Sequence, residues 1–260
     1  MKEQQDESIL KTSSLSVIFS KKQVLSGVDL AFAHRKITSV IGPSGSGKST
    51  LLRALNRMTD FVPEVQVEGD VSFKGHSIFD DQVDAADIRR RIGMVSQNSV
   101  VFRKSIFENV AYGLRIKGSH DSGRIEHQVA ESLKKVHLWD ALKDRLDHDA
   151  SDIGREQQQR LCMARALVLS PEVLLIDEPT GDLDSGSTNR IEVVLRELRD
   201  ERTIVIVTHS LHQAARISDK TAFLHFGKLV EYRDTRRFFT NPVMKLTEDY
   251  LTGRIFGDER

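Results

Sequence analysis

The sequence predicts an α/β fold in which helices cover a mostly parallel sheet. Short apolar runs alternate with helical patterns along much of the chain, which is the signature of this class. The runs are rich in β-branched residues and apolar on both faces, as buried parallel strands are; they are ITSVI (37–41), VLLI (173–176), TIVIVT (203–208) and TAFLHF (221–226). Helical patterns lie between them, at 48–58 and 187–200.

Two further regions differ from this alternation. The stretches 14–33 and 67–75 alternate between apolar and polar residues, which indicates antiparallel strands near the N-terminus. Residues 104–165 carry no strong strand signal and read as helical. We therefore expect one domain over 1–260, with a core of about 1–100 and 166–260 and an inserted helical subdomain of about 101–165.

Composition narrows the class of protein. With 39% hydrophobic and 29% charged residues, the chain is typical of a soluble globular protein. Its formal net charge of +0 argues against a dedicated nucleic-acid-binding protein, which usually carries a basic excess. The single cysteine, Cys162, excludes an intrachain disulfide and is expected to be a small buried residue. The polar start MKEQQDESILK has no signal-peptide pattern, and no apolar run reaches the ~18 residues that span a bilayer.

The segment GPSGSGKS (42–49) has the spacing of a phosphate-binding P-loop and follows an apolar strand, as such a loop must. Its glycines let successive backbone N–H groups face a phosphate, and the next helix points its positive end at the same place. Lys48 adds a charge for the β- and γ-phosphates, and the Ser49 hydroxyl can bind Mg²⁺. The predicted nucleotide-binding residues are Gly42, Pro43, Ser44, Gly45, Ser46, Gly47, Lys48, Ser49 and Thr50.

The segment VLLIDEP (173–179) is the expected second half of such a site. A buried strand delivers Asp177 at its carboxyl end, where the carboxylate can hold Mg²⁺ directly or through water. Glu178 follows at once and can orient or deprotonate the attacking water. Apolar strands that end in an acidic residue are common. The preceding P-loop is therefore what identifies Asp177 and Glu178 as part of a nucleotide site.

Two polar residues follow two other predicted strands. His209 ends VIVTHS (205–210) and can sense and polarise a γ-phosphate. Gln97 lies in GMVSQNSVVF (93–102), and its amide oxygen can complete a Mg²⁺ shell or the water site. Taken alone, His209 is better explained as a helix-capping residue and Gln97 as a surface residue. Beside the other motifs, we expect Lys48, Gln97, Glu178 and His209 to be catalytic.

This ordered set resembles the ATP-binding-cassette (ABC) family of ATPases, over nearly the whole chain. After the P-loop and Gln97 come QQQRLCMARAL (157–167), LLIDEP, TGDLD (180–184) at the family's D-loop and THS at its histidine switch. The resemblance implies a P-loop NTPase fold with an antiparallel β-subdomain, ATP and Mg²⁺ as ligands, and a dimer of ATPase subunits. It also places Phe19 where an aromatic ring stacks on adenine.

Several stretches, including QAARISDKTAF and the tail LTEDYLTGR, are similar to the phosphate-import subunits of this family. This similarity implies that ATP hydrolysis powers uptake of inorganic phosphate, which an external phosphate-binding protein supplies. It further implies two transmembrane permease subunits as partners and a peripheral position on the cytoplasmic face of the inner (plasma) membrane. Another cargo, such as an amino acid or a phosphonate, is the alternative.

Two departures from the family pattern bear on activity. The glutamine loop QNSVVFRKS lacks the prolines that are usual in the family, so its backbone is freer. In the family this loop faces the membrane subunits, so the departure bears on the identity or strength of the coupling to them. The signature LSGGQ aligns to IGREQ (153–157), where the family's serine and glycines bind the γ-phosphate held by the other subunit. Gly154 keeps a backbone N–H but no hydroxyl. Glu156 would repel a phosphate by roughly 3 kcal/mol at ~5 Å and an effective dielectric of ~20, and Arg155 can offset this.

Which of these charges dominates depends on side-chain directions, which the sequence does not give. We expect a homodimer that binds ATP well and hydrolyses it slowly, or a heterodimer whose partner supplies an intact signature. A regulatory subunit that binds nucleotide with little turnover is a third reading, which the intact Glu178 and His209 speak against.

Overall fold

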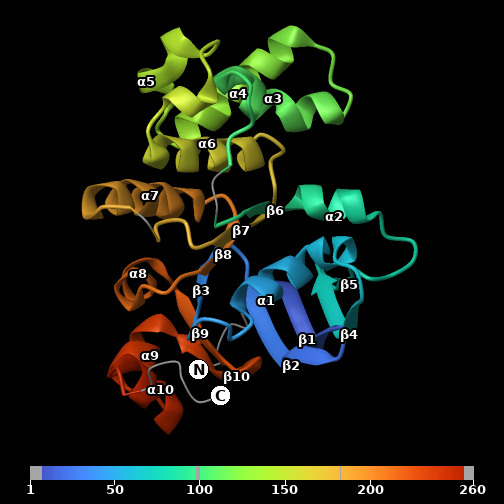
Figure 1. The fold of residues 1–260 in the computed structure, drawn as a ribbon, viewed down its shortest axis with the longest axis vertical. Helices are drawn as coiled ribbons and strands as arrows, with labels where there is room; N and C mark the ends of the chain where they lie inside the picture. Colours follow the sequence, from blue (N-terminus) through green and yellow to red (C-terminus); the bar gives the residue numbers. More distant parts are fainter. Residues whose placement is uncertain (1–7, 98–99, 182, 255–260) are drawn as a thin grey trace, which may run out of the picture.

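The computed structural model describes residues 8–97, 100–181 and 183–254. It contains the predicted mostly parallel sheet, a six-stranded sheet with the order β10-β9-β3-β8-β7-β6 (Figure 1). Five of its strands run parallel, and β10 is antiparallel to β9. The strands are β3 (Ile37–Ile41), β6 (Ile92–Val95), β7 (Val173–Asp177), β8 (Thr203–Val207), β9 (Lys220–His225) and β10 (Lys228–Asp234).

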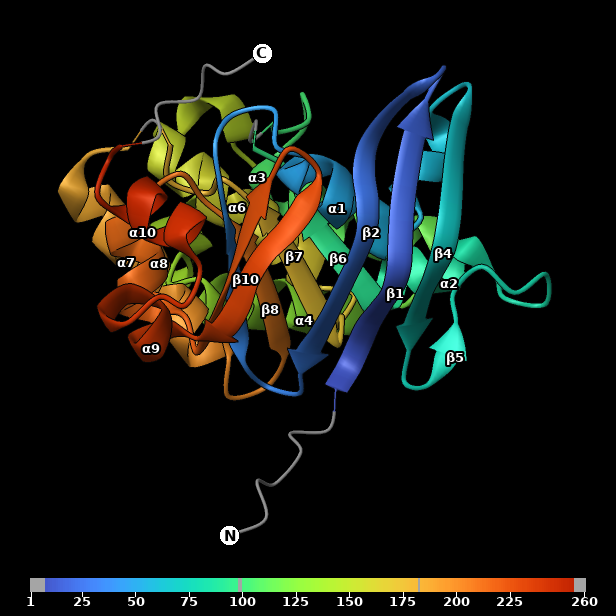
Figure 2. The same cartoon turned by 90° about the horizontal axis from the view of Figure 1, so that it is seen from below.

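The expected antiparallel strands near the N-terminus form a second sheet of order β2-β1-β4-β5. Figure 2 shows its long strands side by side, next to α1 and β10. The strands are β1 (Ser8–Phe19), β2 (Lys22–Ala33), β4 (Val65–Phe73) and the short β5 (His76–Ser77). Its register carries bulges, for instance between Thr12 and Leu15, which bend a long strand around the core.

The helices surround the six-stranded sheet. Helix α1 (Lys48–Leu55) lies between the two sheets, whereas α3, α4 and α6 form a layer at one end of the molecule, with α7 beneath them (Figure 1). The α-helices other than α1 are α2 (Ala85–Arg91), α3 (Ile106–Ile116), α4 (Ser122–Lys135), α5 (Trp139–Leu142), α6 (Arg155–Leu167), α7 (Ser185–Leu198), α8 (Leu211–Ile217), α9 (Thr235–Thr240) and α10 (Lys245–Leu251). The 3-10 turns are η1 (Met58–Phe61), η2 (Lys143–Arg145) and η3 (Ala150–Asp152).

The central strands β3, β7 and β8 are buried at every position, because each of their faces packs against a different hydrophobic core. In β7, Leu174 and Ile176 face the helical layer, whereas Val173 and Leu175 face α1 and the antiparallel sheet. Successive side chains of a strand point to opposite faces, so both sets must be apolar. The absence of alternation in the sequence of these strands thus follows from burial on both sides.

One boundary differs from the sequence-based expectations. The first helix ends at Leu55 and not at Met58, because Arg57 adopts the left-handed conformation (φ 59°) and a 3-10 turn follows. The division into a core and an inserted helical subdomain of about 101–165 stays a prediction.

The parallel strands bring their carboxyl ends to one edge of the sheet. The segments that leave this edge are the P-loop after β3, residues 96–97 after β6, Glu178 after β7 and residues 208–209 after β8. This edge is where open α/β sheets bind their ligands. Residues 98–99 of the predicted glutamine loop, residue 182 of the predicted D-loop, and residues 1–7 of the polar start lie outside the described ranges.

Candidate functional site

The P-loop has a backbone that only glycine can adopt at its key turns. Gly42, Gly45 and Gly47 have φ values of 151°, 75° and 98°. A Cβ atom on Gly42 would lie 2.0 Å from the Leu224 carbonyl oxygen. One on Gly47 would lie 2.7 Å from a methyl group of Leu25. The loop is therefore fixed by its glycines against β9 and β2, and Gly47 serves as the N-cap of α1.

The Lys48 side chain lies within this loop. Its ammonium donates hydrogen bonds to the carbonyl oxygens of Gly42 (2.9 Å) and Pro43 (2.7 Å). Burial lowers the pKa of Lys48 to about 8, although the nearby carboxylates of Glu178 and Asp177 act in the opposite direction. A buried cation at the start of a helix is well suited to bind a phosphate.

Glu178 occupies the centre of the strand edge. Its backbone N–H donates to the carbonyl of Val207, and its φ of 44° is a strained value for a residue with a side chain. Its carboxylate pairs with His209 Nε2 (2.7 Å) on one oxygen and accepts from Gln97 Nε2 (3.1 Å) on the other. Three segments far apart in the sequence thus converge on one carboxylate.

Asp177 ends β7 in a buried position, with 4% of its surface exposed. Its Oδ1 atom has no hydrogen-bond partner among the described residues. A buried carboxylate oxygen without a partner fits a cation ligand, and Mg²⁺ is typically held by one or two protein oxygens together with phosphate oxygens and water. The residues present therefore fit a Mg²⁺ ion. Among the described residues no cluster of three or more His, Cys, Asp or Glu could form an all-protein metal site.

A cavity of about 560 Å³ opens over this edge and brings most of the predicted residues together. Its lining comprises Val24, Ser44, Gly45, Gly47, Lys48, Ser49, Thr50, Gln97, Glu178 and His209. The other predicted residues, Gly42, Pro43 and Ser46, belong to the same loop. The carbonyl groups of Gly42 and Pro43 accept hydrogen bonds from Lys48, and the carbonyl group of the buried Ser46 accepts one from the Gly227 N–H. Val24 was not predicted, because a single apolar residue in a strand carries no signal of a binding site.

Phe19 and Gly154 do not line this cavity. Phe19 is the last residue of β1, paired with Lys22 and Val65, and it packs half-buried against the core of the antiparallel sheet. Gly154 lies at the start of α6, in a separate cavity with Asp184 and Ser187 of the α7 start. Neither position contacts the P-loop cavity within this chain.

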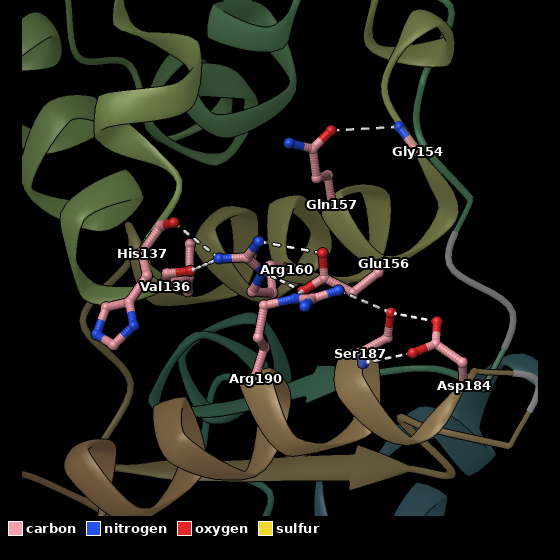
Figure 3. A network of polar contacts seen from close by, with 9 residues as sticks. All are labelled: Val136, His137, Gly154, Glu156, Gln157, Arg160, Asp184, Ser187 and Arg190. Carbon is pink, nitrogen blue, oxygen red and sulfur yellow. Dashed lines mark hydrogen bonds and ion pairs between the residues drawn. The ribbon is translucent and has the colours of Figure 1, made fainter.

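The structure shows where the side chains of Arg155 and Glu156 point at the start of α6, which the sequence left open. The Glu156 carboxylate is turned toward α7 and pairs with Arg160 (2.6 Å) and Arg190 (3.4 Å) (Figure 3). Its charge is therefore offset within the chain by two arginines. Arg155 is exposed, with no hydrogen bond or ion pair to any residue that the structure describes. Gly154 has no side chain for capping, and Gln157 Oε1 accepts a weak bond from its N–H (3.3 Å).

Tyr250 of α10 is a contact that sequence reasoning missed. Its ring stacks on Phe223 of β9, with 4.6 Å between centroids, and its hydroxyl lies close enough to the Gly42 backbone for that group to act on its pKa. Burial raises the pKa of this phenol, so it stays protonated. The tail LTEDYLTGR was singled out by resemblance, but nothing in its pattern points to the P-loop.

A second cavity, of about 580 Å³, lies between β6 and the helices α3 and α6. It is lined by apolar groups such as Phe102 and Tyr112 and by the arginines Arg89, Arg90 and Arg165. The predicted buried cysteine, Cys162, borders it, and burial raises the pKa of its thiol. A low-reactivity thiol in this position fits a packing role.

Over the described residues, every helix is too short or too polar to cross a bilayer.

Comparison with known proteins identifies the family. The family model described as ABC transporter matches residues 25–181. A phosphate import ATP-binding protein PstB 1 of Lactococcus lactis is 47% identical over 249 residues, covering 96% of this chain and 98% of the relative. The phosphate import ATP-binding protein PstB of Colwellia psychrerythraea is 47% identical, covering 94% of this chain and 88% of the relative.

Solved structures share the fold. A dimeric post-hydrolysis state of the ATP-binding cassette MJ0796, bound to ADP and Pi, has a TM-score of 0.75 at 28% identity, covering 87% of this chain and 99% of that one. A bacterial Atm1-family ABC exporter with ATP bound has a TM-score of 0.77 at 26% identity, covering 96% of this chain and 42% of that one. With the P-loop, the buried aspartate and the Glu178 cluster in place, the chain belongs to the ABC transporter family, as one of its ATP-binding subunits.

Proposed function

We propose that this chain is the ATP-hydrolysing subunit of an ABC importer for inorganic phosphate. The observation that carries the hydrolytic part is the position of Glu178. Its carboxylate faces the P-loop cavity and is oriented by both His209 and Gln97. A carboxylate held in this way, next to a buried lysine, has the arrangement that water activation at a γ-phosphate requires.

The residues act on ATP as follows in this proposal. The backbone N–H groups of the P-loop and the Lys48 ammonium bind the phosphates. Water attacks the γ-phosphorus and passes a proton to the Glu178 carboxylate, while the bond from that phosphorus to the bridging oxygen of ADP breaks. His209 orients Glu178, and its exposed ring is free to contact the departing phosphate. Phe19 stacks on the adenine.

Asp177, Ser49 and Gln97 are the residues that would hold Mg²⁺. A bound Mg²⁺ neutralises charge that develops on the phosphate oxygens. The partnerless Oδ1 of Asp177 supports this assignment, and Ser49 lines the same cavity. The Lys48 ammonium donates to the carbonyl groups of Gly42 and Pro43, which hold it within the loop.

The cargo and the partners rest on the relatives. Several relatives of 47–48% identity, over nearly the whole chain, are named phosphate import ATP-binding proteins. The full proposal therefore includes a second ATPase subunit, two transmembrane permease subunits, an external phosphate-binding protein that acts indirectly, and a peripheral position on the cytoplasmic membrane face. No role in nucleic-acid binding is included. The cavity beside Phe102 and Tyr112, with exposed Ile116 nearby on α3, supports a docking place for a membrane partner.

One observation favours a second candidate, a nucleotide-binding subunit with little turnover of its own. Gly154 lacks the hydroxyl that the family places at the start of α6, and Arg155 stands where the family has a glycine. A homodimer would then bind ATP without a complete γ-phosphate site. A heterodimer partner with an intact signature would restore turnover at this chain's Lys48 and Glu178.

The import proposal is tested by uptake of radiolabelled phosphate. Cells that lack their own phosphate-import ATPase subunit receive this chain together with its permease genes, or the Glu178→Gln variant as a control. We expect uptake with the native chain and none with the variant. Uptake of a phosphonate or an amino acid in place of phosphate would contradict the cargo. ATP binding with no uptake and no hydrolysis would favour the low-turnover candidate.

A further inference from the structure

The residue that replaces a signature glycine, Glu156, is enclosed in a polar network that no phosphate role explains. It is the second residue of α6, yet its side chain is only 12% exposed. A carboxylate that loses this much water needs partners of opposite charge. Arg160, one helical turn further along α6, supplies them through Nε at 2.6 Å and Nη2 at 3.1 Å (Figure 3).

Arg160 is itself held in place. Its Nη1 donates to the carbonyl oxygens of Val136 (2.9 Å) and His137 (2.7 Å), at the end of α4. The guanidinium is 8% exposed and uses both of its terminal nitrogens. The pair is thus anchored on a second helix of the same layer and does not depend on a mobile side chain.

Arg190 connects this pair to α7. Its Nε lies 3.4 Å from Glu156 Oε1, and its Nη2 donates to Ser187 Oγ (2.9 Å). Ser187 in turn donates to Asp184, the N-cap of α7, through Oγ (2.7 Å) and through its backbone N–H (2.9 Å). Figure 3 shows this chain of contacts running from the α6 start to the α7 start. Both helix starts line one cavity.

We propose that Glu156 and Arg190 are positioning residues that brace the start of α6 against the start of α7. Gly154 and Asp184, the N-cap residues of the two helices, are then held in one fixed arrangement within the chain. This inference rests on the proposed function, since it concerns how the helix start that faces a second subunit is held. Glu156 supports that helix start from behind and does not enter the phosphate site.

The brace is tested with a double-mutant cycle made of Glu156→Gln, Arg190→Gln and the double variant. Urea midpoints and steady-state ATP kinetics are measured on the full chain for all of them. Arg196→Gln is the matched control, because Arg196 also lies on α7 and also pairs with a glutamate, Glu192, at 3.7 Å. Arg190→Lys keeps the charge but not the fork that reaches both Glu156 and Ser187.

We expect each single variant to lower the urea midpoint and the double variant to lower it by less than the sum of the two, because both single variants remove the Glu156–Arg190 contact, although Glu156 also pairs with Arg160 and Arg190 also binds Ser187. We expect kcat to fall about 10-fold in either variant, with KM for ATP unchanged, because the P-loop is not touched and a small displacement of the helix start is costly. Arg190→Lys should recover part of the loss, and Arg196→Gln should leave kcat unchanged.

Strictly additive changes in the urea midpoint would overturn the brace. Coupled midpoints with an unchanged kcat would show that the contact serves stability alone, which overturns the positioning role. If the native chain itself does not hydrolyse ATP, the hydrolytic function fails, and with it the positioning role. The urea cycle then still decides whether the brace exists.

Discussion

The N-cap residue of both α1 and α6 is a glycine, but the two positions differ in whether the backbone requires one. Gly47 has a φ of 98° and no room for a Cβ atom, so its backbone demands glycine. Gly154 has φ −62° and ψ 155°, which any residue adopts, and a Cβ atom there would meet only Gln157 Oε1, at 4.0 Å. A glycine at the N-cap of a helix is therefore not by itself evidence of a phosphate-binding site.

The two regions also differ in how they use charge. At α1 the charged groups converge on one cavity, with Lys48 on one side and Glu178 on the other. At α6 the charges neutralise one another inside the chain, and Arg155 alone is left without a partner among the described residues. The first region is arranged to bind a ligand, whereas the second is arranged mainly to hold two helices together.

The largest effect should come from removing the charge at α1. We expect Lys48→Ala to weaken ATP binding about 100-fold, because charge-assisted hydrogen bonds to phosphate are worth about 1.5–3 kcal/mol and Lys48 is buried beside the site. Binding is measured by calorimetry, with thermal unfolding as a check of folding. A folded variant with native ATP affinity would remove the distinction between the two helix starts.

Adding a side chain at each of the two glycines sharpens the same comparison. Gly154→Ser restores the hydroxyl of the family's signature without strain, so we expect ATP turnover to rise about 10-fold and the helix cap to improve. Gly47→Ser is the matched control and should lose ATP binding, because its Cβ atom clashes and its φ is unfavourable. Equal effects at the two positions would show that the structural difference between them has no functional meaning.

The pH dependence of binding tests the charge of Lys48 directly. Because its folded pKa is lowered to about 8, Lys48 is charged below this value and loses its proton as the pH rises through it. Since the charged form binds phosphate, ATP affinity should fall about 10-fold between pH 7 and pH 9. Calorimetry with a non-hydrolysable ATP analogue avoids turnover and keeps the Glu178 carboxylate, which contributes to this pKa. Lys48→Arg keeps its charge over this range and should show a flat profile, as would the native protein if the account is wrong.

The smallest effect concerns the support of the P-loop from α10. We expect Tyr250→Phe to weaken ATP binding about 3-fold, because it removes the hydroxyl that lies near the Gly42 backbone but keeps the stack on Phe223. Tyr112→Phe, on the distant α3, is the control and should bind as the native chain does. Identical affinities for the two variants would exclude a role of the tail in shaping the loop.

Much of the α1 region could be predicted because it depends on local pattern and on one rule of topology. The glycine spacing of 42–49 fixes the loop, and parallel strands bring Gln97, Glu178 and His209 to one edge. The contact of Glu178 with both neighbours follows from that edge. Phe19 and Gly154 do not line the cavity, and their proposed ligand contacts depend on parts of the site outside it.

The contact between α6 and α7 could not be predicted because it depends on how separate helices pack, whereas the pair of Glu156 with Arg160 lies within one helix. Glu156 and Arg190 are far apart in the sequence, and nothing in either segment marks them as partners. The charge of Glu156 suggested repulsion of a phosphate, and the structure instead pairs it with two arginines. Tyr250 escaped notice for the same reason, since its contact with Gly42 arises from the packing of α10 on β9.

Steady-state ATP hydrolysis by the purified chain, measured beside the Glu178→Gln variant, tests the central claim most directly. We expect the native chain to hydrolyse ATP and the variant to lose at least about 100-fold in turnover while it still binds ATP, because only the proton acceptor has been removed. A native chain that binds ATP but turns it over no faster than the variant would contradict the claim that this cluster is a hydrolytic site.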